Sequence, residues 1–188
     1  RLPKVGFTRL GVQGKYLAIN LADTGHDLMV YDLRRDLLEE LAAHKAKIAK
    51  SNADIGAHAE IIGVCVLDDR QVNDVVLGPG GLLETAKPGT IIAIHSTVDP
   101  QTIADVARVA NERGVEVVDA PVSGSEAGAR AKTMLYMVGG SKEAFERCRP
   151  IFATSAKTVL HTGALGTGIR AKLAHQLVTC VNMLSAYE

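Results

Sequence analysis

Gly11, Gly14 and Asp32 are the first residues along the chain whose types and spacing could do chemistry. The two glycines open a stretch of helical periodicity, and Asp32 lies 18 residues after Gly14. Glycines at a helix start let an anion approach free backbone N–H groups at the positive end of the helix dipole. A carboxylate at this distance accepts hydrogen bonds from an adenosine ribose. The pattern predicts a dinucleotide site with cofactor contacts from Leu10, Gly11, Val12, Gln13, Gly14 and Asp32.

The charges around Asp32 bear on which dinucleotide binds. The carboxylate favours NAD, because it would repel the 2′-phosphate of NADP. Arg34 and Arg35 follow directly, and a guanidinium is a good partner for a phosphate. We therefore expect NAD, count Arg34 among the cofactor residues, and leave NADP open.

Arg9 departs from the glycine pattern, because it occupies the place of the first glycine in G-x-G-x-x-G. If that turn needs a positive φ, a residue other than glycine costs about 1–2 kcal/mol there. Three interpretations stay open: a side chain directed to solvent, an additional phosphate contact, or an impaired cofactor site.

The elements that must position these residues alternate regularly. Strands are expected at 5–7, 28–31, 47–49, 61–66, 90–95, 115–118, 133–138 and 158–161, and helices at 12–22, 36–44, 53–59, 69–77, 99–113, 142–152 and 166–188. The continuous apolar strands are typical of parallel sheets buried on both faces. This predicts an α/β fold with a doubly wound, Rossmann-type, mostly parallel sheet. Its ligand crevice would lie at the carboxyl ends of the strands, where Val66, Leu67, Ser96 and Thr97 fall.

Composition excludes several other classes of protein. Lysine plus arginine equals aspartate plus glutamate, 21 of each, so no basic field attracts nucleic acid or anionic membrane. No apolar run approaches the ~20 residues that cross a bilayer. Cys65, Cys148 and Cys180 are widely spaced and odd in number, which indicates reduced structural thiols, not a metal or disulfide framework. A cytoplasmic protein without a metal site is expected.

Four stretches, GFTRLGVQG, HSTVDP, DAPVSGS and GTGIRAKLAHQ, occur in this order. Together they resemble the β-hydroxyacid dehydrogenases, the group of 3-hydroxyisobutyrate dehydrogenase and, more distantly, 6-phosphogluconate dehydrogenase. The resemblance covers essentially the whole chain. It implies an oxidoreductase that transfers a hydride between a nicotinamide cofactor and a small 3-hydroxy acid, or its semialdehyde or keto form.

The resemblance also implies roles for particular residues. Lys172 matches the catalytic lysine, the general acid or base of the reaction. Gln176 holds the position of an asparagine that orients the substrate, and His175 resembles a variant of the phosphogluconate branch. Ser123 and Gly124, with Ser125 beside them, match the site of the substrate carboxylate, and Ser96 and Thr97 match a pair beside the nicotinamide ribose. The alternatives without a role in catalysis or binding are a solvated Lys172, a surface or packing His175, and a helix-capping role for Ser96 and Thr97.

Other positions depart from the family pattern. Ser125 and Lys132 each replace a common glycine, and Ile94-His95 replaces Asp-x before the Ser-Thr pair. These departures leave the substrate open.

Two segments are expected, a nucleotide-binding domain at 1–165 and the start of an interdomain helix at 166–188. The family has a second, all-helical domain after that helix, which closes the active site and often dimerises. We therefore expect the 188-residue chain to bind cofactor but to turn over poorly alone, and the full-length form to be a homodimer or larger.

Three other functions compete with a dehydrogenase. A non-catalytic NAD-sensing domain would need only Gly11, Gly14 and Asp32. Imine reductases share the architecture but usually lack the lysine. A paralogue that has lost its cofactor and acts as a scaffold is supported only by Arg9.

Overall fold

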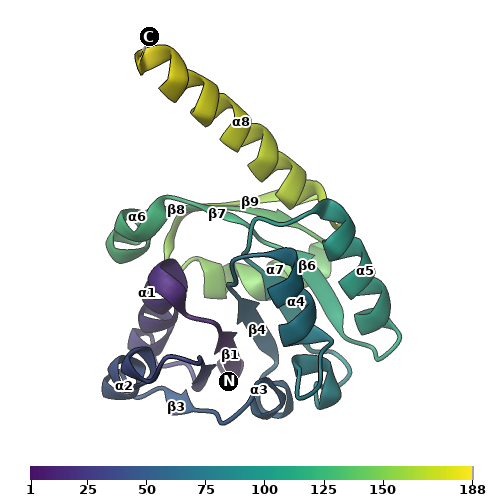
Figure 1. Cartoon of the computed structure of the whole chain (residues 1–188). Coiled ribbons are helices and arrows are strands. Elements are labelled where there is room, and N and C mark those ends of the chain that lie inside the picture. The colour runs from purple at the N-terminus through teal and green to yellow at the C-terminus, as the bar shows by residue number, and fades with distance from the viewer. Residues whose placement is uncertain (188) are drawn as a thin grey trace.

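The computed structural model describes residues 1–187 as a nine-stranded sheet covered by helices on both faces (Figure 1). The strand order is β3-β2-β1-β4-β5-β6-β8-β7, with β9 paired to β8. The strands are β1 (Val5–Thr8), β2 (Leu28–Tyr31), β3 (Lys47–Ile48), β4 (Ile61–Val64), β5 (Ile91–Ile94), β6 (Glu116–Asp119), β7 (Val122–Ser123), β8 (Met134–Gly139) and β9 (Ala156–Gly163).

The helices alternate with these strands along the chain. They are α1 (Gly11–Asp23), α2 (Arg35–Ala43), α3 (Asn52–His58), α4 (Asp69–Val76), η1 (Leu82–Glu84, a 3-10 turn), α5 (Pro100–Asn111), α6 (Ser125–Ala131), α7 (Lys142–Phe152) and α8 (Thr167–Tyr187).

The first six strands in space, from β3 to β6, run parallel to one another. Strand β8 is antiparallel to β6 and β7, and β9 is parallel to β8. The predicted doubly wound, mostly parallel sheet is therefore confirmed. Because parallel strands share their direction, the turns after β1, β4, β5 and β6 meet at one edge of the sheet.

Alternating residues of the strands pack into two separate hydrophobic cores, one on each face of the sheet. In β5, Ile91 and Ala93 pack with the core under α1, α2 and α7, whereas Ile92 and Ile94 pack with the core under α3, α4 and α5. Two-sided burial explains why these strands read as uninterrupted apolar runs in the sequence.

The differences from the expected elements have local causes. The strand expected at 61–66 ends at Val64, because the Val66 N–H donates to the Ser96 hydroxyl and not to a neighbouring strand. Strand β6 is shifted by one residue toward the C-terminus, and β9 extends beyond its expected range at both ends. β7 and α6 were not predicted, since 122–131 is rich in Ser, Gly and Ala and has no apolar period.

Three positions where the related family has glycine keep the backbone that glycine favours. Arg9, Ser125 and Lys132 all have positive φ, at 60°, 56° and 58°. Each costs about 1–2 kcal/mol relative to glycine. Arg9, Ser125 and Lys132 therefore occupy turns whose backbone conformation favours glycine.

Helix α8 leaves the body of the domain after its first turns (Figure 1). Its buried residues are Gly168, Ile169 and Lys172, all near its start. Farther along, the apolar side chains of Leu177, Val181 and Leu184 are exposed. Within residues 1–187, no helix is both long and apolar enough to cross a membrane.

Candidate active site

The start of α1 is open to an anion. Its N-cap residue is the buried Leu10, which makes no side-chain cap, and its first turn has no acidic residue. Four other helices, α3, α4, α5 and α7, are capped by the side chains of Ser51, Asp68, Asp99 and Ser141. Within residues 1–187, no side chain therefore competes with a ligand for the first N–H groups of α1, which is the arrangement that binds phosphate.

Glycine is required at the two positions of this turn for different physical reasons. Gly11 has φ +50°, and a Cβ built on it would meet nothing within 4 Å. At Gly14, a Cβ would lie 3.1 Å from atoms of Phe7, Arg9 and Cys65. Gly11 thus leaves space beside the backbone, and Gly14 lets α1 pack closely on the sheet. These are the roles of the second and third glycines in the dinucleotide-binding motif G-x-G-x-x-G.

Asp32 joins the end of β2 to the turn before α1. Its buried carboxylate accepts hydrogen bonds from the Leu10 N–H, at 2.7 Å, and from the Arg34 N–H, at 2.8 Å. A carboxylate oxygen has two lone pairs, so each retains one for a ligand hydroxyl. Asp32 therefore fixes the turn and keeps the capacity expected of a ribose acceptor.

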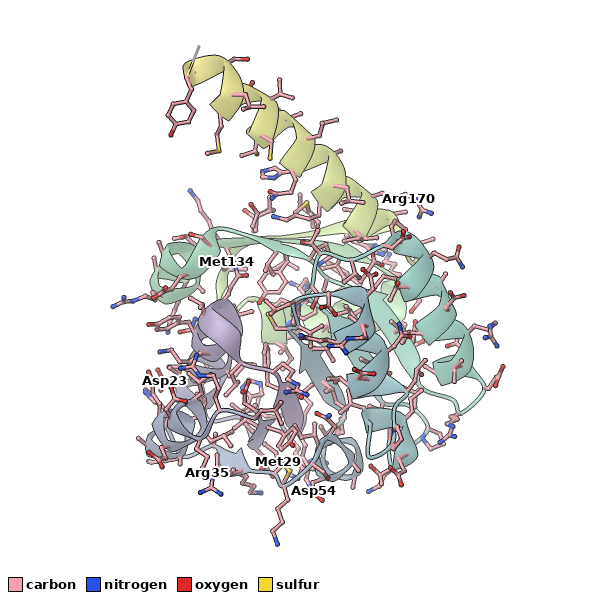
Figure 2. All side chains as sticks on the ribbon, viewed as in Figure 1. Asp23, Met29, Arg35, Asp54, Met134 and Arg170 are labelled. Carbon is pink, nitrogen blue, oxygen red and sulfur yellow. The ribbon has the colours of Figure 1, made fainter. Side chains whose placement is uncertain are left out.

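The arginines near this turn differ in their partners. Arg34 is exposed and pairs with Asp36. Arg35 lies at the start of α2 and points away from the body of the domain (Figure 2). Arg9 is half-buried, and its Nε is enclosed without a hydrogen-bond partner. The Arg9 side chain is thus partly enclosed, and its possible roles as a solvent-directed side chain, a phosphate contact or an impairment of the cofactor site stay open.

A cleft of about 490 Å³ lies between the carboxyl ends of the strands and α8. This volume is in the range of small-molecule sites. The cleft brings together ten residues predicted from the sequence, which are Gln13, Val66, Ser96, Thr97, Ser123, Gly124, Ser125, Lys172, His175 and Gln176. The other predicted residues do not line it: Leu10, Gly11, Val12, Gly14, Asp32 and Arg34 belong to the adjoining β1–α1 and β2–α2 turns, and Leu67 is exposed beside it.

Lys172 is the buried charge of this cleft. It is 7% exposed, and its Nζ donates to the Gln176 side-chain oxygen at 3.2 Å. Burial lowers the pKa of Lys172 from its ordinary value. No carboxylate pairs with it in the described part of the chain. The ammonium therefore loses its proton more readily than a solvated lysine does, which suits acid–base work.

Ser96 connects two strand ends at the floor of the cleft. It is buried, and its hydroxyl accepts from the Val66 N–H at 2.8 Å. The capping alternative for Ser96 and Thr97 is wrong, because the α5 cap is Asp99. Thr97 is exposed on the rim.

A tight turn after β7 positions Gly124 and Ser125. Gly124 has φ 138°, and a Cβ there would lie 2.7 Å from Met134 Sδ, which packs from β8 beneath α6 (Figure 2). This close packing brings the backbone next to Ser123 to the surface of the cleft, where Gly124 and Ser125 are exposed.

His95 is a cleft residue that the sequence marked only as a departure from the family. It is buried, its Nδ1 lies 2.9 Å from the Ala120 carbonyl oxygen, and its ring stacks on Phe7. Burial lowers its pKa from 6.5 to about 4. A carbonyl oxygen can only accept, so Nδ1 carries a proton, and the lowered pKa leaves the imidazole neutral near pH 7.

His95 should make the protein sensitive to acid. The folded state binds the imidazole proton more weakly than the unfolded state, so the stabilisation is complete above about pH 6.5 and is lost as pH falls toward 4. The full loss is about 3 kcal/mol. His95→Gln retains a donor to Ala120 but does not titrate. Urea unfolding between pH 7 and 4 should show a smaller pH dependence for this variant, and equal slopes would contradict the assignment.

The sequence missed four cleft residues: Cys65, His95, Val122 and Thr179. Thr179 had a usable signal, since it lies four residues after His175 on the same helix face. Cys65 and His95 directly follow β4 and β5, where position alone favoured them. In residues 1–187 no group of three or more His, Cys, Asp or Glu side chains is arranged to hold a metal ion.

The uncapped start of α1, its glycine turn and Asp32 at the end of β2 define a dinucleotide-binding α/β domain. Residues 4–163 match the family described as the NAD binding domain of 6-phosphogluconate dehydrogenase. The chain belongs to this family of NAD-binding domains, which supports NAD as its cofactor.

Individual relatives agree with the family. Over 98% of its length, the chain is 37% identical to a probable mitochondrial 3-hydroxyisobutyrate dehydrogenase from Dictyostelium discoideum, covering 57% of that protein. Over its whole length, it is 34% identical to the NAD-dependent L-serine dehydrogenase of Pseudomonas aeruginosa, covering 63% of it. The crystal structure of a putative oxidoreductase from Mycobacterium avium 104 superposes with a TM-score of 0.92 at 40% identity, over 98% of this chain and 65% of that one.

The comparisons also show how much of its relatives the chain spans, and that one structural neighbour shares only its fold. The chain spans about three fifths of the length of the curated relatives that it matches. An imine reductase from Pseudomonas sp. has a TM-score of 0.85 but only 17% identity, over the whole of this chain and 64% of that one, so it shares the fold alone.

Proposed function

We propose that the chain forms the catalytic nucleotide-binding part of an NAD-dependent dehydrogenase that acts on a small 3-hydroxy acid. The observation that carries this proposal is a buried lysine, Lys172, in the same cleft as Ser123, Gly124 and the ends of the strands. A domain that only bound NAD would have no need to desolvate an ammonium beside an exposed backbone turn.

The cofactor would extend from the β1–α1 turn into the cleft. The N–H groups at the start of α1 would bind the diphosphate, and the free lone pairs of Asp32 would accept from the adenosine ribose. Ser96 and Thr97 would flank the nicotinamide ribose. The buried Asp32 and the pairing of Arg34 with Asp36 support NAD over NADP.

Oxidation of a hydroxy acid removes a hydride from carbon and a proton from oxygen. When bound, the nicotinamide supplies the acceptor for the hydride. Lys172, as the free amine, takes the hydroxyl proton, and in the reverse direction its ammonium returns it. Gln176 accepts a hydrogen bond from Lys172 Nζ and so orients it. Ser123 and the backbone beside Gly124 would hold the substrate carboxylate, and His175 lies on the rim.

The substrate class is supported by the cleft and by the relatives. Polar groups that line the cleft include Lys172, which would face a hydroxyl, and Ser123, which would face a carboxylate. Two relatives are named for 3-hydroxyisobutyrate and L-serine, which are both small 3-hydroxy carboxylates. Three residues differ from the common family pattern, which are Ser125, His95 and Gln176. The identity of the substituent on C2, the carbon between the hydroxyl-bearing carbon and the carboxylate, is therefore left open.

We also propose that the exposed side of α8 packs against a helical segment beyond this chain, in a homodimer or larger assembly. Exposed Leu177, Val181 and Leu184 and the greater length of the relatives support it. Amide exchange along the second half of α8 should slow in a version extended beyond Glu188. Unchanged exchange would contradict this packing.

A substrate screen tests the proposed function. A version extended beyond Glu188 would be assayed with a series of small 3-hydroxy acids, using NAD and NADP in parallel, and NADH formation would be followed by absorbance. We expect turnover with at least one 3-hydroxy acid and NAD. Binding of NAD without turnover on any of them would favour the NAD-sensing alternative, and reduction of imines alone would favour an imine reductase.

A further inference from the structure

Helix α8 begins against a carboxylate that comes from a distant strand. Asp119, the last residue of β6, accepts hydrogen bonds from the Gly166 N–H and from the Ile169 N–H, both at 2.7 Å. The two bonds use different oxygens of the one carboxylate. The donors lie 47 and 50 residues further along the chain, so this is a long-range anchor and not a local cap.

The fit around Asp119 is close on every side. Asp119 has no exposed surface, and a Cβ on Gly139 would lie 2.4 Å from its Oδ1. A Cβ on Gly168 would lie 2.4 Å from the Met137 carbonyl oxygen and 2.8 Å from the Asp119 carbonyl oxygen. Glycines at 139 and 168 therefore let the first turn of α8 lie directly on the ends of β6 and β8.

Burial raises the pKa of Asp119, whereas the bonds from the N–H groups of Gly166 and Ile169 oppose that rise. No lysine or arginine pairs with it in the part of the chain that the structure describes. The partners that hold its charge are the N–H groups and the positive end of the helix dipole. A buried carboxylate with these partners is an anchor for the helix start.

We propose that Asp119 is the positioning residue for Lys172, because it ties the start of α8 to the strand that leads into Ser123. This inference rests on the proposed function of Lys172. Asp119 lies four residues before Ser123, and Ile169 lies three residues before Lys172, on the same side of α8. One carboxylate thus links the segment that carries Ser123 to the helix that carries Lys172, and both residues line the same cleft.

Only the start of α8 is held by the domain, which makes the anchor important. Beyond Lys172 every described residue of the helix is exposed, from Leu173 onward. Without the bonds from Asp119, Ile169 packing and the glycine contacts would remain, but the first turn could fray. The exposed body of α8 would then move Lys172 relative to Ser123.

The wild-type chain offers a test that does not depend on activity. We expect the Gly166 and Ile169 amides to exchange with solvent at least tenfold more slowly than the Val12 and Gln13 amides in the uncapped first turn of α1. Equal exchange in the two helix starts would overturn the anchor. This measurement stands even if substitutions at Asp119 prevent folding.

Asp119→Asn, with Asp119→Ser as a second variant, tests the effect on Lys172. The readout is the apparent pKa of Lys172, measured by competitive acylation and mass spectrometry across a pH series. We expect it to rise toward 10.5, the ordinary value, as the side chain gains solvent. The matched control is Asp99→Asn, which makes the same change of side chain at the cap of α5, a helix without cleft residues.

The outcomes separate this inference from the proposed function. NAD affinity should stay within about twofold in Asp119→Asn, while kcat of the extended version should fall at least tenfold with a smaller change in KM for substrate. A lower Tm with an unchanged Lys172 pKa and unchanged kcat would overturn the positioning role. If no substrate is turned over by the wild type, the proposed function fails, yet the pKa readout still decides the role of Asp119.

Discussion

Lys172→Ala should reduce kcat by about a thousandfold in a version extended beyond Glu188, because a positioned acid–base group contributes about 10²–10⁴ to a rate. NAD affinity should stay unchanged, since the expected diphosphate and ribose contacts come from the β1–α1 turn and Asp32. The measurement is steady-state NADH formation from the best 3-hydroxy acid of the screen, together with the Kd for NAD by calorimetry.

A neighbouring cation provides the control for this variant. Arg170 lies two residues before Lys172 on α8, but it is exposed, and it lies at the outer edge of the domain (Figure 2). Arg170→Ala should retain kcat within a few-fold. Equal losses in the two variants would mean that α8 is merely sensitive to substitution. Full activity of Lys172→Ala would exclude the lysine as the acid or base.

Gly11→Asp should weaken NAD binding by at least about 100-fold. The new carboxylate would stand at the start of α1, where the diphosphate is expected. Two unit charges 4 Å apart interact by about 4 kcal/mol at an effective dielectric constant of about 20, and each 1.4 kcal/mol is about a factor of ten. A Cβ at Gly11 meets nothing within 4 Å, so the change should cost the fold only about 1–2 kcal/mol, which its φ of +50° imposes.

Gly25→Asp isolates the electrostatic part of that effect. Gly25 follows the other end of α1, also has a positive φ, and also leaves open space around a built Cβ. The two variants therefore carry a similar backbone cost, and only Gly11→Asp adds a charge beside the expected ligand. We expect NAD affinity of Gly25→Asp within about twofold of wild type. A similar loss in both would refute the assigned diphosphate position.

The fold could be predicted well where burial and turn chemistry leave a clear pattern. The apolar runs of β2 and β5 and the Gly25 end of α1 gave those elements nearly to the residue. The long helix was also predicted, and α8 is observed over Thr167–Tyr187. The pairing of β8 antiparallel to β6 was not predicted, because strand direction depends on contacts between distant segments.

The residues of the candidate site also fall into those with a local sequence pattern and those that depend on contacts between distant segments. Glycines and an acid at fixed spacing led to the β1–α1 turn, and a resemblance led to Lys172 and Ser123. The bonds of Asp119 to the start of α8 appear only when segments 47 residues apart are brought together. The burial of His95 likewise depends on Phe7 and Tyr136 from other strands.

A crystal structure of the extended protein with NAD and a 3-hydroxy acid identified by the screen tests the central claim most directly. We expect diphosphate oxygens within hydrogen-bond distance of the N–H groups at the start of α1, and the substrate hydroxyl within hydrogen-bond distance of Lys172 Nζ. A diphosphate bound elsewhere, or a hydroxyl remote from Lys172 while the substrate lies in the cleft, would contradict the account.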